Sequence, residues 1–242
     1  MKHAPRVGVV TFPGSNGDRD ALWAFQQVLA ADAFLIDYRT TRLPPVDALV
    51  LPGGFSYGDY LRCGAIARFA PVMTEIVDFA ERGGPVLGIC NGFQILTEAH
   101  LLPGALLRNQ TLRFHAHWTS IKFEATSRSW AQPLATGPTL RLPVAHGDGA
   151  YTIDPGDLPV LEANGQIVAR YCTSDGDVAA EANANGSIAN IAGVSNRRGN
   201  VVGLMPHPER AVESLVGGSD GVHILRAFLS AIDAEVSVPS TS

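Results

Sequence analysis

The sequence predicts an α/β fold in which a central, mostly parallel sheet is flanked by helices. Residues 7–12, 33–38 and 48–51 are short apolar runs of strand type, and the amphipathic pattern over residues 18–31 predicts a helix between the first two. Strands and helices that alternate in this way form βαβ units, whose strands are parallel and whose crossovers are right-handed. The N-terminal part of the chain is therefore expected to form the parallel part of the sheet.

A long helix is predicted over residues 64–82, after the third strand. Its predicted inward face consists of apolar side chains at helical spacing, which are Ile66, Phe69, Met73, Ile76, Val77 and Ala80. The pair Gly83-Gly84 follows, and glycine is common just past the end of a helix. The helix is therefore expected to end at residue 82.

The C-terminal half changes to shorter, alternating segments. Strands are predicted at residues 114–123, 139–144, 167–172, 187–192 and 200–205. The pair Asn185-Gly186 predicts a hairpin turn, and residues 222–232 predict a last helix. Because we see neither an internal repeat nor a long linker, residues 1–236 are expected to form a single domain, and residues 237–242 a disordered tail.

The composition is that of a globular protein that is long enough for a substantial core. The chain has 242 residues, 46% of them hydrophobic, and a net charge of −5. Its lysine and arginine residues are scattered, whereas nucleic-acid binding requires a basic face, so we expect no nucleic-acid partner. The apolar run at residues 7–10 is too short for a signal peptide or a membrane span. Three widely spaced cysteines argue against a disulfide framework and a zinc site, and they favour a reducing cytoplasm.

The stretch Gly88-Ile89-Cys90-Asn91-Gly92 predicts a sharp turn from a strand to a helix. Apolar residues precede it, and Phe93 and Leu96 indicate a helix after it. The two glycines allow strand and helix to approach closely. This G-x-C-x-G pattern is the thiol counterpart of the G-x-S-x-G nucleophile elbow. Because the dipole at a helix N-terminus favours a thiolate over a thiol, Cys90 is the candidate nucleophile.

The segment His207-Pro208-Glu209 supplies a candidate base and a carboxylate to orient it. Prolines at positions 206 and 208 favour extended geometry, so the side chains of His207 and Glu209 are expected on the same side of the chain. The carboxylate can hold one imidazole nitrogen while the other faces the thiol. Together with Cys90, these residues match the logic of a catalytic triad.

Two backbone segments are candidates for an oxyanion hole. Attack of a thiolate on a carbonyl carbon produces an oxyanion, which requires fixed N–H donors. The N–H of Asn91, directly after the nucleophile, is one candidate in the elbow geometry. The glycine-rich loop at residues 52–60 follows a parallel strand, so the N–H of Gly53 or Gly54 is the second candidate. The predicted chemistry is acyl transfer through a thioester.

The other cysteines and histidines give less specific signals. Cys63 and Cys172 lie in an amphipathic or strand context, and we interpret them as core residues because most buried cysteines are inert. His115 and His117 could be a metal pair, but no third ligand is spaced to complete it, so no metal site is expected. The tight turn that begins at His146 could approach a ligand or a partner.

These motifs resemble those of the class I, triad-type glutamine amidotransferases. The shared motifs are G-x-C-x-G-x-Q, which begins at Gly88, and the histidine and glutamate at residues 207–209. More narrowly, the chain is similar to the small glutaminase subunits of phosphoribosylformylglycinamidine synthase, from purine biosynthesis. The similarity runs through nearly all of the chain, and the block that specifies the subunit is Gly54-Phe55-Ser56-Tyr57-Gly58-Asp59-Tyr60-Leu61-Arg62-Cys63.

The resemblance implies a flavodoxin-like fold made of one glutamine amidotransferase domain, and it implies roles for particular residues. Cys90 is the implied nucleophile, His207 the general base and acid, and Glu209 the carboxylate that orients it. The other implied site residues are Gly54 and Asn91 for the oxyanion hole, and Gln94 and Phe114 for glutamine binding.

Two positions depart from the pattern of this family. Many members have a cysteine where this chain has Gly17, a difference that is expected to leave the triad untouched. The turn after His146 is usually Gly-Glu-Gly. Here Asp148 shortens the acid by one methylene, which changes the reach of any contact that it makes.

The resemblance also implies an activity and partners. The chain would hydrolyse glutamine to glutamate and ammonia, as the glutaminase subunit of an ATP-dependent carbon–nitrogen ligase in the cytoplasm. The ammonia would pass to a larger synthetase subunit that makes formylglycinamidine ribonucleotide, and a third small protein would join the heteromeric complex.

The residues also bear on cofactors and on rival functions. The loop at residues 13–18 has neither a G-x-G-x-x-G motif nor a Walker lysine, so we expect no cofactor on this chain. The resemblance implies that ATP and magnesium are used by the synthetase subunit. Two alternatives stay open. One is a different triad-type amidotransferase or cysteine hydrolase on the same fold, and the other is a non-catalytic binding module.

Overall fold

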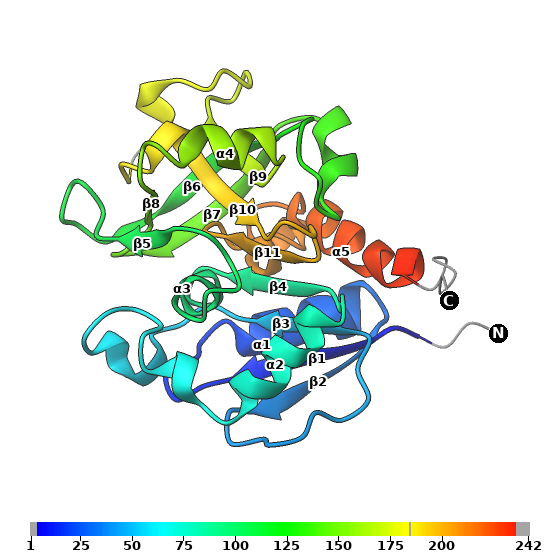
Figure 1. Ribbon diagram of the computed structural model, residues 1–242. Helices are drawn as coiled ribbons and strands as arrows, with labels where there is room; N and C mark the ends of the chain where they lie inside the picture. Colours follow the sequence, from blue (N-terminus) through cyan, green and yellow to red (C-terminus); the bar gives the residue numbers. More distant parts are fainter. Residues whose placement is uncertain (1–3, 184, 236–242) are drawn as a thin grey trace.

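The computed structural model describes residues 4–183 and 185–235, and within them it contains a nine-stranded mixed sheet (Figure 1). The strands lie in the order β2-β1-β3-β4-β11-β10-β9-β6-β7. Their bounds are β1 Arg6–Thr11, β2 Asp32–Asp37, β3 Ala48–Leu51, β4 Val86–Ile89, β6 His115–Phe123, β7 Leu140–His146, β9 Ile167–Cys172, β10 Ile191–Ser195 and β11 Val201–Leu204. A separate antiparallel pair consists of β5 Ala105–Leu107 and β8 Ala150–Thr152. The predicted α/β fold is confirmed.

The first five strands in this order are parallel to their neighbours. β1 pairs with β2 and β3, and β4 pairs with β3 and β11, in parallel register each time. Helices cover both faces of this part (Figure 1). α1 Asp18–Trp23 and α5 Gly221–Glu235 both contact the turn at Pro208–Arg210, on the face opposite α2 Val72–Glu81 and α3 Asn91–Glu98. The carboxyl ends of β1, β3, β4 and β11 therefore meet at one edge of the sheet.

The remaining strands continue the same sheet in antiparallel fashion. β10 pairs with β11 and β9, and β6 pairs with β9 and β7, all antiparallel. The short helix α4 Leu158–Ala163 lies just before β9 in the chain. The additional strands that the C-terminal pattern predicted thus extend the central sheet rather than form a second layer.

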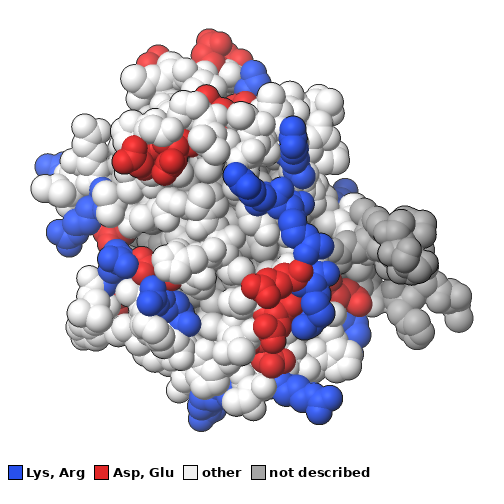
Figure 2. Space-filling model, viewed as in Figure 1, with Lys and Arg blue, Asp and Glu red and all other residues white. Residues whose placement is uncertain are grey.

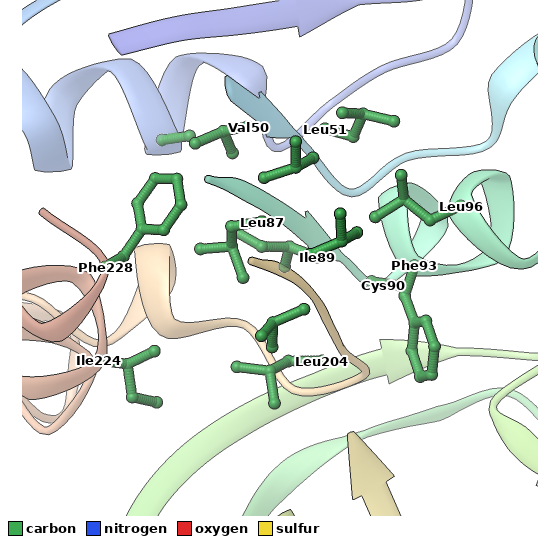
Figure 3. Packing of buried hydrophobic residues seen from close by; sticks show 14 of the residues in the cluster. Val50, Leu51, Leu87, Ile89, Cys90, Phe93, Leu96, Leu204, Ile224 and Phe228 are labelled. Atoms are coloured by element: carbon green, nitrogen blue, oxygen red, sulfur yellow. The ribbon is translucent and has the colours of Figure 1, made fainter. Parts of the chain in front are cut away.

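The core lies on both faces of β4, as Figure 3 shows. Leu87 and Ile89 are fully buried between neighbouring strands, which explains why β4 is a continuous apolar run rather than an alternating one. Side chains from the flanking strands and helices complete this cluster; they include Val50, Leu51, Phe93, Leu96, Leu204, Ile224 and Phe228. Cys90 lies where this core meets the first turn of α3.

The predicted helix at residues 64–82 is wrong in its first half. The structure has a 3₁₀ turn at Ala67–Phe69, and α2 begins only after Pro71. Proline disfavours helical geometry in the residue before it, and Ala70 is accordingly extended, with ψ of 144°. Phe69, predicted to face inward, is instead 74% exposed. The later inward positions Met73, Ile76 and Ala80 are buried as predicted.

The predicted hairpin at Asn185-Gly186 is also wrong. The side chain of Asn185 is buried and donates hydrogen bonds to the carbonyl oxygen of Gly149 and the hydroxyl of Tyr171. The pair therefore holds neighbouring segments together and is not the tip of a hairpin. The strand predicted at residues 187–192 begins only at Ile191, after a 3₁₀ turn. The elements β5, β8 and α4 were not predicted, because their residue patterns are too short to indicate a strand or a helix.

Charged side chains of both signs lie next to one another on the face shown in Figure 2. None of the helices in the described ranges combines the length and the apolarity needed to cross a bilayer. The tail predicted at residues 237–242 lies outside the described residues. The single domain predicted for residues 1–236 stays a prediction, which the continuous sheet supports.

Substitution of Gly92 is expected to break the packing of α3 on the sheet. A Cβ at this position would overlap the carbonyl oxygen of Leu51 in β3, so Gly92→Ala must move α3 away from its place. We expect a loss of about 3 kcal/mol in the free energy of unfolding, measured by urea denaturation. Gly156→Ala is the control because Gly156 is exposed. Equal stability of the two variants would contradict this account of the packing.

Candidate active site

Loops from four adjacent strands bring the predicted site residues together. The loop at residues 12–17 follows β1, Gly53 and Gly54 follow β3, Cys90 follows β4 and His207 follows β11. Because these strands are neighbours and parallel, their carboxyl ends form one continuous edge (Figure 1). Residues over a hundred positions apart in the sequence therefore share one site.

Cys90 occupies a strained turn between β4 and α3. Its φ is +50° and its ψ −105°, a conformation that residues with a side chain rarely adopt. The backbone N–H of Cys90 donates to Leu204 on β11, and its carbonyl oxygen accepts from Gln94 in α3. The side chain is only 4% exposed, and its Sγ lies 3.7 Å from the carbonyl oxygen of Ala145. The predicted nucleophile elbow is thus present, with the thiol held at a helix N-terminus.

His207 and Glu209 form a buried pair. The Nδ1 of His207 lies 2.6 Å from Oε1 of Glu209, and the two residues are 1% and 2% exposed. The backbone N–H of His207 donates to Pro143 in β7, which fixes the chain at this point. Among the described residues the Nε2 of His207 has no hydrogen-bond acceptor or donor in standard geometry, so it is available to a ligand or to the thiol.

Gly53 explains how the imidazole reaches the cysteine. A Cβ on Gly53 would lie 2.7 Å from Cε1 of His207 and 3.6 Å from Cβ of Cys90. The imidazole therefore lies directly over the bare backbone of Gly53, next to Cys90. The sequence suggested Gly53 only as an oxyanion donor, and its steric role becomes visible in three dimensions.

The environment of His207 favours its cationic form. Burial by itself opposes protonation of the imidazole, but the Glu209 carboxylate and the Cys90 side chain outweigh it and raise the pKa of His207 to about 10. An imidazolium beside a thiol favours a thiolate–imidazolium pair, which is the reactive form of a catalytic cysteine.

Gly17 lies against the orienting carboxylate. A Cβ at this position would be 3.1 Å from Oε1 of Glu209 and 3.2 Å from the backbone nitrogen of Gly53. The expectation that a difference at position 17 leaves the triad untouched is therefore wrong, since a larger residue here contacts Glu209. The backbone N–H of Gly17 also donates to the carbonyl oxygen of Gly53, which connects the loop after β1 to the loop after β3.

The backbone of Gly54 has the geometry of an oxyanion donor. Asn16 donates to the carbonyl oxygen of Gly53 and Phe55 donates to that of Gly14, so Gly54 pairs with Ser15 without using its own N–H. In such a pair the N–H points away from the partner strand. Its φ of +157° and the lack of space for a Cβ both require glycine here.

Asn91 is the first residue of α3, and the first N–H groups of a helix have no partner within it. The two predicted oxyanion donors thus lie near Cys90, Gly54 on the loop after β3 and Asn91 at the start of the helix after β4. Their role in the reaction stays a prediction.

A cavity of about 310 Å³ lies beside the cysteine. It is lined by Cys90, Gly54 and the predicted glutamine-binding residues Gln94 and Phe114. Phe114 is 53% exposed and its ring lies 6.2 Å from that of Phe55, so two aromatic side chains form one wall near the opening. This space is the candidate substrate pocket.

Gln94 is held by hydrogen bonds at both ends of its amide. Its Oε1 accepts from Nδ2 of Asn91 at 2.9 Å, and its Nε2 donates to the carbonyl oxygen of Asp148 at 2.6 Å. The amide therefore connects α3 to the turn at residues 146–149. Direct binding of glutamine by Gln94 stays a prediction.

The residues of the cavity wall that were not predicted as site residues include two acids, a thiol and a guanidinium: Asp59, Asp148, Cys63 and Arg108. Cys63 is buried, as expected of a core cysteine, but its Sγ donates to Oδ2 of Asp148 at 3.3 Å inside the pocket. Burial and the neighbouring Asp59 and Asp148 raise the pKa of the Cys63 thiol far above its usual value. Cys63 is therefore a neutral donor and not a second nucleophile. The loop at residues 57–64, which carries two of these residues, lies largely within the block that resembles the glutaminase subunits, but no role in the site was predicted for Asp59 or Cys63.

His146 faces the same cavity as a neutral side chain. Its Nδ1 donates to Oδ1 of Asn109 at 3.0 Å, because Nδ2 of Asn109 already donates to the carbonyl oxygens of Arg113 and His146. Burial, reinforced by the neighbouring histidines His115, His207 and His117, lowers the pKa of His146 to about 3. The turn that begins at His146 does approach the pocket, as its sequence suggested.

His115 and His117 lie on β6 with ring centroids 5.5 Å apart. Nε2 of His115 is hydrogen-bonded to the Thr111 hydroxyl at 2.7 Å. Across residues 4–183 and 185–235, no group of three or more histidine, cysteine, aspartate or glutamate side chains is arranged to hold a metal ion.

Comparison with known proteins finds a family model, curated relatives and a solved structure that agree with one another. The model of the CobB/CobQ-like glutamine amidotransferase domain matches residues 4–218. The subunit PurQ of phosphoribosylformylglycinamidine synthase from Thermomicrobium roseum is 59% identical over 93% of this chain and 95% of its own length. PurQ from Moorella thermoacetica is 52% identical over 93% and 95%. A chain in the structure of PurLQS from Thermotoga maritima superposes with a TM-score of 0.79 at 40% identity, over 94% of this chain and 98% of that one.

The buried pair of His207 and Glu209 predicts that the free energy of unfolding depends on pH. Because the folded-state pKa of His207 lies above the value in an unfolded chain, its stabilisation is complete below pH of about 6.5 and is lost as the pH rises toward 10. Glu209→Gln removes the Glu209 charge that holds the proton on His207. The wild-type free energy of unfolding should fall by up to about 1.4 kcal/mol per pH unit between pH 7 and 9, more steeply than that of the variant.

Urea denaturation at a series of pH values measures this difference. Glu213→Gln is the matched control, because Glu213 is an exposed acid that accepts a hydrogen bond from Trp23 and none from His207. Parallel pH profiles for wild type and Glu209→Gln would show that Glu209 does not hold His207 in its protonated form.

Proposed function

This chain belongs to the family of CobB/CobQ-like glutamine amidotransferase domains and, within it, to the PurQ subunits of phosphoribosylformylglycinamidine synthase, and we propose that Cys90, His207 and Glu209 are its catalytic residues. The activity is hydrolysis of glutamine to glutamate and ammonia, which supplies the synthetase that makes formylglycinamidine ribonucleotide in purine biosynthesis. The observation that supports the catalytic assignment is the buried His207–Glu209 pair beside a cysteine on a strained turn.

The first step forms a thioester. The Sγ of Cys90 attacks the side-chain amide carbon of glutamine, and the carbonyl oxygen becomes an oxyanion held by the N–H groups of Gly54 and Asn91. When the tetrahedral intermediate collapses, the carbon–nitrogen bond breaks and His207 donates its proton to the departing nitrogen, which leaves as ammonia. Glu209 stabilises the imidazolium and keeps Nδ1 engaged, so that Nε2 is the nitrogen that transfers protons.

The second step releases glutamate. His207, now neutral, removes a proton from a water molecule that attacks the thioester carbon. The same oxyanion donors stabilise the second tetrahedral intermediate. Its bond to Sγ then breaks, and Cys90 leaves as a thiolate beside the protonated His207. Low exposure of all three residues limits the access of bulk water to these steps.

The protein acts in a heteromeric complex with a synthetase subunit and a third subunit, as the relationship to the chain in PurLQS indicates. We further propose that ATP and magnesium are used on the synthetase subunit and not on this chain. We propose the cytoplasm as its compartment, which the three free thiols of Cys63, Cys90 and Cys172 support.

Replacement of the nucleophile separates glutamine use from synthesis. In the reconstituted complex, Cys90→Ala should reduce glutamine-dependent product formation to background, because no thioester can form, while added ammonia still supports normal synthesis. Both rates are measured as formylglycinamidine ribonucleotide formed. Cys172→Ala, which changes a cysteine on β9, is the control and should keep both activities. Loss of both activities in Cys90→Ala would contradict the assignment.

The two alternative functions predict other outcomes. A different cysteine hydrolase would form a thioester on Cys90 from an ester or another amide, but not from glutamine, as mass spectrometry of the intact protein would show. A non-catalytic binding module would retain near-normal synthesis from glutamine after His207→Ala. With the proposed roles, that variant loses roughly a thousandfold or more of glutamine-dependent activity.

A further inference from the structure

A second cavity, of about 700 Å³, lies at the opposite end of β4 and β11 from Cys90. Its walls come from four segments, which are the residues just before β4, the residues just before β11, the loop at residues 127–133 and the C-terminal half of α5 (Figure 1). It is larger than the cavity of about 310 Å³ beside the cysteine, and the two cavities share no lining residue. The proposed chemistry therefore leaves this space unused.

Hydrogen bonds hold the walls of this cavity together. The backbone N–H of Trp130 donates to the carbonyl oxygen of Gly199 at 3.2 Å. A Cβ on Gly199 would lie 2.3 Å from the carbonyl oxygen of Arg128, so the loop packs directly on the glycine. Nδ2 of Asn200 donates to two carbonyl oxygens, one near the end of α2 and one just after it. The cavity is thus formed by the fold itself.

The buried polar side chains of this cavity have donors without acceptors. Ser127 and Ser129 are 4% and 6% exposed, and their hydroxyl groups are hydrogen-bonded to each other at 2.9 Å. Because that bond uses one of the two hydroxyl protons, the other proton has no acceptor among the described residues. In the same part of the chain, the buried Nε1–H of Trp130 also has no partner. A ligand rich in acceptors would satisfy these groups.

Two arginine side chains add positive charge to the cavity. Arg128 and Arg198 both line it, and both are exposed. Arg198 donates from Nη1 to the carbonyl oxygen of Glu81, which holds its guanidinium at the end of α2. Among the side chains that the structure describes, no carboxylate pairs with either arginine. A guanidinium has a planar fork of donors that matches the oxygens of a phosphate group.

We propose that this cavity binds a nucleoside monophosphate. Arg128, Arg198 and the free serine hydroxyl bind the phosphate, and the indole of Trp130 supplies an aromatic surface for the base. The indole is held in place by Phe228 of α5, with the ring centroids 5.1 Å apart. The volume is in the range of pockets for small ligands of this size. The site goes beyond the glutaminase function and does not depend on it.

Isothermal titration calorimetry of the full chain with AMP, GMP, CMP and UMP tests the proposal. At least one of them is expected to bind with a dissociation constant below about 1 mM, and about tenfold or more tightly than its nucleoside or inorganic phosphate. Arg128→Gln and Arg198→Gln should each weaken this binding about tenfold or more, because each removes a charged donor to the phosphate.

Three further variants show which features of the cavity matter. Arg197→Gln is the matched control, since it removes the same charge from an exposed neighbour that does not line the cavity, and it should bind like wild type. Trp130→Phe keeps an aromatic ring but loses the N–H, so it should weaken binding by a smaller factor than the loss of either lining arginine. Cys90→Ala should bind like wild type, because the triad is not part of the site.

Urea denaturation with and without nucleotide shows that each variant is folded and gives a second measure of binding. The proposal is wrong if neither heat nor a shift of the urea midpoint is seen with any of the four nucleotides at about 5 mM. Equal weakening by Arg197→Gln would show general attraction of anions and would also overturn it. If inorganic phosphate binds as tightly as the nucleotide, the assignment of a nucleoside to this cavity is wrong.

Discussion

The structure depends on how closely α3 approaches the sheet at the end of β4. Gly88 and Gly92 remove the two Cβ atoms that would collide, one with the first turn of the helix and the other with the Leu51 carbonyl oxygen. Gly203 on β11 does the same for the ring of Phe93. Because these contacts are between backbone and buried side chains, they cannot relax around a methyl group. Because of this packing, Cys90 is held in a strained conformation with its thiol at a helix N-terminus.

The triad adds an electrostatic constraint to this geometric one. A buried ion pair gains little net stability, since desolvation of both charges opposes their attraction. The His207–Glu209 pair therefore stabilises the fold only while the imidazole is protonated, and its main effect is to hold that proton on His207. Oε2 of Glu209 has no hydrogen-bond partner in the described part of the chain, and Gly17 lies against Oε1. The carboxylate is thus poorly solvated on both oxygens, which strengthens its hold on the imidazolium.

The sequence predicted those parts of the fold and site that follow from local patterns. β3 and β9 have the predicted bounds, and the cysteine elbow and the His207–Glu209 pair each depend on a few adjacent residues. The wrong predictions arise where one local signal was considered without a second signal that opposes it. Pro71 ends the helical pattern of residues 64–70, and the buried hydrogen bonds of Asn185 override its turn propensity.

The acidic wall of the pocket could not be read from the sequence for a different reason. Asp59 and Asp148 are 89 positions apart, and the motifs that contain them indicate the family without indicating that the two carboxylates line one cavity. A hydrogen-bond network also joins Asp148 to the turn at Cys90, because the amide of Gln94 is bonded to Asn91 and to the carbonyl oxygen of Asp148 at once. The first residue of α3 and the turn that carries Asp148 therefore share one set of hydrogen bonds. Changes within such a network are not additive, so loss of Gln94 is expected to disturb the start of α3 and the turn at residues 146–149 together.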